Sequence, residues 1–287
     1  AVYASYQSFP NSTEQALYTI HHAGGETTIA VNQTMGGGTW IYLGNFKFTA
    51  HEQAHERIVL TNQSNKSGKI ITADAIKIGG GMGNIARSPL ESPYPIEAET
   101  SGYPRFTEAA RYWLQWAGIP DSIYSKSAFR NDYQDDIYAR PQWVNYLKEQ
   151  THIPIDMAFA FHSDAGTTPD DSIIGTLGIY MSKSNDGIYT NRKSREIARD
   201  LTDMIQTQIL SDVRKVYNPQ WSRRGMWNQS YIEARIPDVP TMLLELLSHQ
   251  NFADMRYGLD PRFRFLICRA IYKGTVSYTH LRAHETP

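Results

Sequence analysis

Two short apolar runs dominate the hydrophobic pattern in the second half of the chain. The first covers residues 154–161 and ends at His162, Ser163 and Asp164; the second covers residues 239–247. Apolar runs of this length, bounded by proline and by polar residues, predict strands that are buried on both faces. Ligands of open α/β sheets bind beyond the carboxyl ends of parallel strands, so His162 and Asp164 are expected at a functional site.

The second run contains one charged residue, Glu245, near its far end. An ionised carboxylate among leucines is costly to bury unless a cation, a proton or hydrogen bonds compensate it. A metal ion beside His162 would supply that compensation, and a salt bridge to Arg235 or Arg256 is the structural alternative. We therefore expect the ends of the two runs to form one site.

The first 85 residues have the pattern of an all-β domain. Short, partly alternating apolar segments are separated by clusters of Gly, Asn and Ser, which is typical of a β-sandwich. The glycine-rich stretch 79–83 lacks the Lys-Ser/Thr or GxGxxG arrangement of a phosphate-binding loop, so we interpret it as a flexible exit from the sandwich. The expected strands cover residues 2–6, 17–22, 27–32, 40–48, 57–61 and 69–78.

The pattern changes to an α/β type after a segment rich in Pro, Ser and Glu, which predicts a linker over 86–104. We expect an α/β domain with a mostly parallel sheet flanked by helices over 105–275. The acidic stretch 132–140 has the wrong spacing for an EF-hand and is interpreted as a surface turn. The other expected elements are helices at 106–117, 142–149, 194–216 and 263–272, a strand at 173–181 and a basic-aromatic loop at 223–227.

Composition narrows the functional classes. Lys plus Arg total 28 against 29 Asp plus Glu, which argues against a broad nucleic-acid-binding surface. The single cysteine, Cys268, excludes an intramolecular disulfide, and the helical period around it predicts a packed core thiol. No apolar run reaches transmembrane length.

The sequence also supports a prediction about each end of the chain. The sequence opens in the middle of an expected strand without a signal peptide, so we expect a fragment whose signal peptide is encoded upstream. The stretch 276–287 resembles an adapter-derived tail, and a non-native, disordered terminus is expected. Its residues His280, His284 and Glu285 are therefore not counted as metal ligands.

The residue types at the two strand ends suit zinc chemistry. A catalytic zinc site uses three protein ligands, and a perturbed carboxylate can act as general base. His162 is the candidate ligand and Glu245 the candidate base, although a lone histidine at a strand end is more often structural. Asp164 can orient a ligand or cap the following turn. Seryl catalysis through Ser163 or Ser248 is less favoured because neither lies in a G-x-S-x-G motif.

Residues 161–165 and 239–245 resemble strand motifs of the zinc-dependent N-acetylmuramoyl-L-alanine amidases of the Amidase_3 type. The resemblance implies His162 as a zinc ligand, Glu245 as the catalytic residue, and Zn²⁺-dependent hydrolysis of peptidoglycan outside the cytoplasm. The helix at 194–205 and the Arg224-Gly225 pair agree with the family pattern, which makes Arg224 and Trp227 candidate substrate contacts. Leu246 and Leu247 depart from the family's Gly-Phe turn.

Residues 31–33, 37–40, 43–46 and 73–75 resemble a different module, the golvesin/xanthan-lyase carbohydrate-binding-like β-sandwich. This resemblance implies glycan contacts at Trp40 and Tyr42. A sandwich of this kind paired with an amidase-like half is similar to secreted proteins of the Bacteroidetes, in which the sandwich interrupts the catalytic domain.

One departure limits the amidase interpretation. The family's histidine loop and glutamate ligand, both N-terminal to the His162 motif, have no counterpart in this sequence. We expect these ligands upstream of residue 1, with Glu108 as a weaker candidate, and the fragment to bind zinc poorly. Two alternatives stay open: a non-catalytic glycan-binding protein, and a protein related to polysaccharide (xanthan) lyases.

Overall fold

The computed structural model describes residues 1–49, 55–79, 105–128 and 130–284, and the expected linker over 86–104 lies outside them. The chain divides into two compact units, Ala1–Pro154 and Ile155–Pro287. The helices expected at 106–117 and 142–149 therefore fall in the first unit, and the domain boundaries drawn from the sequence stay predictions. We describe each unit by itself.

The first unit contains two three-stranded antiparallel sheets. Their strands are β1 (Val2–Ser5), β2 (Ala16–His22), β3 (Gly25–Val31), β4 (Ile41–Gly44), β5 (Arg57–Leu60) and β6 (Ala75–Ile78), in the orders β4-β1-β6 and β3-β2-β5. Strand β2 alternates as predicted, with Ala16, Tyr18 and Ile20 buried. Buried residues of both sheets form one core cluster, as expected for a sandwich. A strand lies within each expected range or close to it, but those expected at 40–48 and 69–78 are shorter, Ile41–Gly44 and Ala75–Ile78.

The same unit continues into helices. They are η1 (Arg105–Thr107), α1 (Ala110–Trp116), α2 (Asp121–Tyr124) and α3 (Asp132–Glu149). The helix expected at 106–117 is therefore broken into η1 and α1, and Gly118 ends it with a φ of 77°. Leu114, Ile119 and Ala139 are buried in a separate apolar cluster of these helices.

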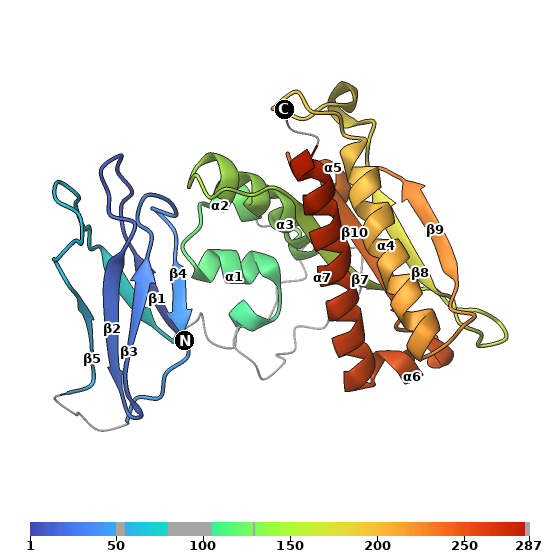
Figure 1. The fold of residues 1–287 in the computed structure, drawn as a ribbon, viewed down its shortest axis with the longest axis horizontal. Helices are drawn as coiled ribbons and strands as arrows, with labels where there is room; N and C mark the ends of the chain where they lie inside the picture. The colour runs from blue at the N-terminus through green and yellow to red at the C-terminus, as the bar shows by residue number, and fades with distance from the viewer. Residues whose placement is uncertain (50–54, 80–104, 129, 285–287) are drawn as a thin grey trace. The chain divides into compact units, whose positions relative to one another are not determined.

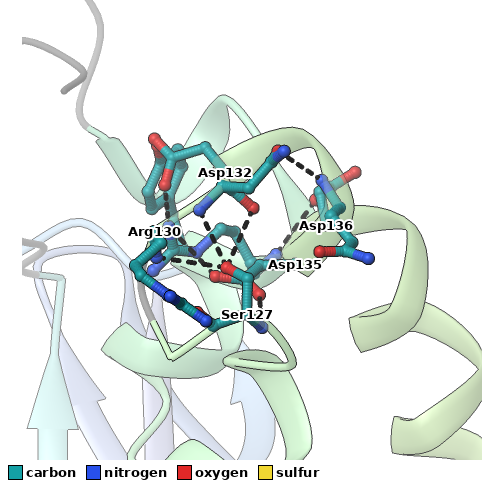
Figure 2. Close-up of polar contacts among 9 residues, drawn as sticks. Ser127, Arg130, Asp132, Asp135 and Asp136 are labelled. Atoms are coloured by element: carbon teal, nitrogen blue, oxygen red, sulfur yellow. Dashed lines mark hydrogen bonds and ion pairs between the residues drawn. The ribbon is translucent and has the colours of Figure 1, made fainter. Parts of the chain in front are cut away.

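The start of α3 corrects the surface turn expected at 132–140. The Asn131 side chain accepts a hydrogen bond from the Gln134 N–H and caps the helix, which therefore begins at Asp132. Figure 2 shows the polar network around this end. Asp135 is fully buried and accepts a hydrogen bond from the Ser127 N–H at 2.6 Å, while Arg111 forms an ion pair with Asp132. The aspartates of this stretch thus accept backbone hydrogen bonds from neighbouring segments and form an ion pair.

The second unit is built on a mixed four-stranded sheet of order β7-β10-β8-β9 (Figure 1). Its strands are β7 (Ala158–Asp164), β8 (Thr176–Tyr180), β9 (Arg223–Asn228) and β10 (Thr241–Ser248). The pairs β7–β10 and β8–β9 are parallel and β8–β10 is antiparallel. The basic-aromatic loop expected at 223–227 is therefore wrong, because those residues form strand β9.

The two predicted core strands differ in how far their side chains are buried. Strand β10 is buried along nearly its whole length, as expected. Strand β7 alternates instead, with Phe159 36% and Phe161 53% exposed. The expectation that β7 is buried on both faces is wrong, because within the described residues it lies at the end of the sheet and pairs only with β10.

The second unit also contains helices. They are η2 (Ser184–Gly187), α4 (Ile197–Val216), α5 (Ile232–Arg235), α6 (Phe252–Gly258) and α7 (Pro261–His284). Helices α4 and α7 lie side by side (Figure 1), and their apolar residues share a core cluster with Met242, Leu244 and Leu246 of β10. No helix in the described part of the chain is both long and apolar enough to cross a bilayer.

Helix α7 corrects two expectations. It continues through the tail expected to be disordered as far as His284, and Tyr278 is buried in the core cluster. Cys268 is exposed rather than packed, because the buried stripe of α7 follows Phe263, Leu266, Ile267 and Ala270.

Candidate active site

Strand register brings the two predicted site residues together. In the parallel β7–β10 pair Glu245 stands directly opposite His162, so their side chains lie on the same face of the sheet. Asp164, two residues beyond His162, shares that face. Met242 and Leu244 point to the opposite face of the sheet, and α4 and α7 pack on that opposite face. The expectation that His162 and Glu245 meet at one place is confirmed as geometry.

A residue that the sequence analysis missed completes the surroundings of His162. Glu233, on the short helix α5, places Oε2 at 2.8 Å from His162 Nε2. Both side chains are largely shielded from solvent, at 26% and 13% exposure for His162 and Glu233. A four-residue helix has too few positions for a periodic pattern, so the sequence offered only an isolated glutamate before the second apolar run.

Arg224 and Asp164 also lie near Glu245, since both act electrostatically on its carboxyl group. Arg224 Nη1 makes an ion pair with Asp164 Oδ2, across a separation of 60 residues in the sequence. The Arg224 guanidinium also lies 5.8 Å from the centre of the Trp227 ring, which is partly exposed. Asp164 is thus held by an arginine from β9, and the expected role of Arg224 and Trp227 as substrate contacts stays a prediction.

The environment of Glu245 favours the protonated carboxyl. Burial is the largest cause that raises its pKa, and the carboxylates of Asp164 and Glu233 raise it further, while His162 and Arg224 oppose the shift. Its Oε2 atom is buried and has no hydrogen-bond partner among the described residues. Glu245 also forms no ion pair there, so the salt bridge to Arg235 or Arg256, the structural alternative, is wrong.

These side chains have the donor types of a zinc site. Imidazole nitrogen and carboxylate oxygen are both zinc ligands, and a buried carboxylate oxygen without a partner is the kind of atom that a cation compensates. Across the ranges that the structure describes, however, no group of three or more His, Cys, Asp or Glu side chains is arranged to hold a metal ion. The His162 imidazole and the neighbouring carboxylates are of the types that bind zinc. They do not by themselves form a three-ligand zinc site.

The alternative of seryl catalysis has one contact in its favour, between Ser163 and His249, but the hydrogen-bond directions do not support it. Ser163 Oγ lies 3.1 Å from His249 Nδ1, and the same Nδ1 lies 3.2 Å from the Ser163 carbonyl oxygen. A carbonyl oxygen only accepts, so this contact favours a proton on Nδ1, and a protonated Nδ1 cannot take the Ser163 proton. Ser248 Oγ donates to the Gly166 carbonyl instead.

The remaining candidates all belong to the first unit. Glu108 occupies the turn between η1 and α1. Trp40 packs against the helix cluster, and Lys77 Nζ lies 4.3 Å from its ring centre. Tyr42 is 53% exposed, with its ring 5.4 Å from that of Tyr3. Their expected roles as zinc ligand and glycan contacts stay predictions.

Comparisons with known proteins bear on the two units differently. Residues 1–80 match the family model described as the Golvesin C-terminal domain, which confirms the resemblance predicted for the sandwich. No curated protein matches the chain.

Among solved structures, the chain is similar to N-acetylmuramoyl-L-alanine amidases. One from Clostridium difficile 630 is 20% identical, with 52% of this chain and 70% of that chain covered and a TM-score of 0.37. The CwlD amidase from Clostridioides difficile, in complex with the GerS lipoprotein, is 14% identical over 55% and 70%, with a TM-score of 0.41. Ami1 from Mycobacterium smegmatis is 17% identical over 62% and 77%, with a TM-score of 0.38. Likeness at this level leaves the function to be argued from the site itself.

Proposed function

We propose that this protein is a cell-wall hydrolase that cleaves the amide between N-acetylmuramic acid and L-alanine in peptidoglycan, with Glu245 as general base and Zn²⁺ as cofactor. The observation that carries the proposal is the pairing of Glu245 with His162 at equivalent positions of two parallel strands. Glu245 there has a raised pKa and a buried oxygen without a partner. The resemblance of both strand motifs to the amidases supports the same assignment.

The chain's own residues have separate roles in this reaction. Ionised Glu245 takes a proton from the attacking water, and its raised pKa makes it a stronger base than an ordinary glutamate. The protonated Glu245 then gives that proton to the leaving nitrogen of L-alanine. Arg224, fixed by Asp164, binds a polar group of the substrate beside the Trp227 ring. Zinc, held in part by His162, would polarise the scissile carbonyl and make water more acidic.

The proposal includes a cellular location. Peptidoglycan lies outside the cytoplasm, so we propose an extracytoplasmic, secreted or cell-surface protein.

The test compares Glu245→Gln with the parent in the full-length protein. We expect the variant to bind one zinc per chain but to lose turnover by about 10²-fold or more, because general acid–base catalysis contributes that much. Turnover is measured as new amino termini released from purified peptidoglycan, and zinc by elemental analysis. Glu196→Gln, an exposed glutamate before α4, is the matched control. Turnover retained in Glu245→Gln would contradict the assignment.

His162 is tested by its metal content. We expect His162→Ala in the full-length protein to lose its zinc, because the substitution removes a ligand nitrogen. Zinc retained after His162→Ala would show that the histidine is structural and would favour the second candidate.

That second candidate is non-catalytic glycan binding by the sandwich. The observation that favours it is the exposed Tyr42 ring next to Tyr3 in a module matching the Golvesin C-terminal domain. Loss of binding to purified cell-wall glycan in a Tyr42→Ala variant would support it, and Tyr42→Phe, which keeps the ring, is the control.

A further inference from the structure

The contact between Glu233 and His162 joins two firmly held elements. Helix α5 contacts β10 and β8, and its neighbouring residue Ala234 is buried. The backbone N–H groups of Ala234 and Arg235 both donate to the Tyr231 carbonyl, which fixes the turn that carries Glu233. His162 lies on β7, paired to β10 through a regular parallel register up to Glu245. The distance of 2.8 Å between Glu233 Oε2 and His162 Nε2 therefore follows from the fold.

Hydrogen-bond chemistry fixes the direction of this contact. An ionised carboxylate only accepts hydrogen bonds, so His162 Nε2 must be the donor. A neutral imidazole has a single N–H, and a proton on Nε2 makes Nδ1 the nitrogen with the lone pair. The carboxylate thus selects one of the two tautomers of His162, in the way that carboxylates behind metal-binding histidines do.

We propose that Glu233 is a positioning residue that holds His162 in the Nε2–H tautomer, so that Nδ1 is the atom through which His162 acts at the site. The tautomer assignment stands independently of what Nδ1 binds. The part of the inference in which Nδ1 receives zinc rests on the proposed function. Neither the motif resemblance nor the strand pattern assigns a role to Glu233.

The first experiment measures the tautomer directly in the full chain. Long-range proton–nitrogen NMR of ¹⁵N-histidine-labelled protein reports which ring nitrogen carries the proton. The chain has nine histidines, so His162 is identified by the signals that vanish in His162→Gln. We expect a proton on Nε2 in the parent, a mixture of both tautomers in Glu233→Ala, and recovery of the Nε2–H form in Glu233→Gln, whose side-chain oxygen can still accept.

The second experiment adds zinc ions to the same samples. We expect the Nδ1 signal of His162 to move, and competition with a chromophoric chelator to give about 10- to 100-fold weaker zinc binding in Glu233→Ala. Glu196→Ala removes an exposed glutamate of the same unit and is the matched control, expected to match the parent. The amide fingerprint of each variant checks that it is folded.

The outcomes separate this inference from the proposed function. A proton on Nδ1 in the parent, or a ring spectrum unchanged in Glu233→Ala, overturns the positioning role even if zinc binds. Zinc that shifts Nε2 instead of Nδ1 also overturns it, because Glu233 would then compete with the metal. If the tautomer depends on Glu233 but zinc moves neither nitrogen, the positioning role stands and the zinc-dependent function fails.

Discussion

Glu245 lies on a strand whose other side chains are almost all buried, and its partner in the register is His162 rather than another apolar residue. Burial is the main reason that its pKa is raised, with two neighbouring carboxylates adding to the shift. The folded protein therefore holds a proton on Glu245 more tightly than the unfolded chain does. This difference links the site to the stability of the whole unit.

The stability of Glu245→Gln should depend on pH in a defined direction. Because folding raises the pKa, the stabilising effect of the proton is complete below the ordinary value of 4.5 and is lost as the pH rises through the folded value. We expect metal-free Glu245→Gln to be more stable than the metal-free parent near neutral pH, with the difference shrinking in acid. Urea denaturation in a chelator at several pH values measures it. A constant difference across pH, or a less stable variant near neutrality, would contradict the burial argument.

Residue-level prediction succeeded where the sequence context made a side chain unusual. A single carboxylate in a leucine-rich run drew attention to Glu245, and the end of the other run drew attention to His162. Glu233 could not be found in this way, because its role depends on a distance to another strand and not on its neighbours in sequence. Cys268 failed for a related reason: the helical period was read correctly, but the thiol lies beside the buried stripe.

At the scale of elements, α4 and α7 approach closely at one glycine. A Cβ atom at Gly274 would stand 2.7 Å from the Cα of Ile205, closer than such atoms normally come. The glycine therefore allows the two backbones to touch, which a larger residue would prevent.

Gly274→Ala should destabilise the second unit. Alanine favours the helix by about 1 kcal/mol over glycine, whereas overpacking against backbone costs about 1–3 kcal/mol, and the clash should win because a backbone atom cannot rotate away. The free energy of unfolding from urea denaturation measures the change. Ser277→Ala, at an exposed position of α7, is the control and should change little. Equal or greater stability of Gly274→Ala would show that the helices separate at low cost.

Long periodic segments were predicted best among the elements, as α4 and β10 illustrate. The beginning of α3 was missed because the acidic stretch 132–140 was interpreted as a surface turn, whereas the Asn131 cap and the buried Asp135 make these residues helical. Strand β7 was placed correctly, but its burial was not, since the apolar run does not reveal whether a strand has neighbours on both sides.

At the scale of the whole molecule, each unit carries its own apolar core. The cluster around Leu244, Ile205 and Phe263 draws all its members from the second unit, and the cluster of the two antiparallel sheets draws its members from the first. Local pattern predicted the change from β to α/β elements along the chain. It could not predict the mixed sheet order, because pairing depends on contacts between distant segments.

The second unit should fold on its own. We expect a fragment of residues 155–287 to unfold in one cooperative urea transition, because its largest core is internal to it. Circular dichroism in the far and near ultraviolet, with binding of a hydrophobic dye, measures this. A fragment with helical signal but strong dye binding and no near-ultraviolet signal would mean that the core needs residues 1–154.

The pairing of β7 with β10 also determines when the site comes into being. Between these neighbouring strands the chain must first make β8, α4 and β9, and contacts such as Asp164 with Arg224 close a loop of 60 residues. Parallel pairing across long loops occurs late in folding, because closing the loop loses conformational entropy before the new contacts can compensate for it. On the ribosome, His162 emerges well before Glu245, so the pairing of these two residues cannot form until β10 has been made. The geometry of the proposed site is thus assembled only after most of the second unit has been made.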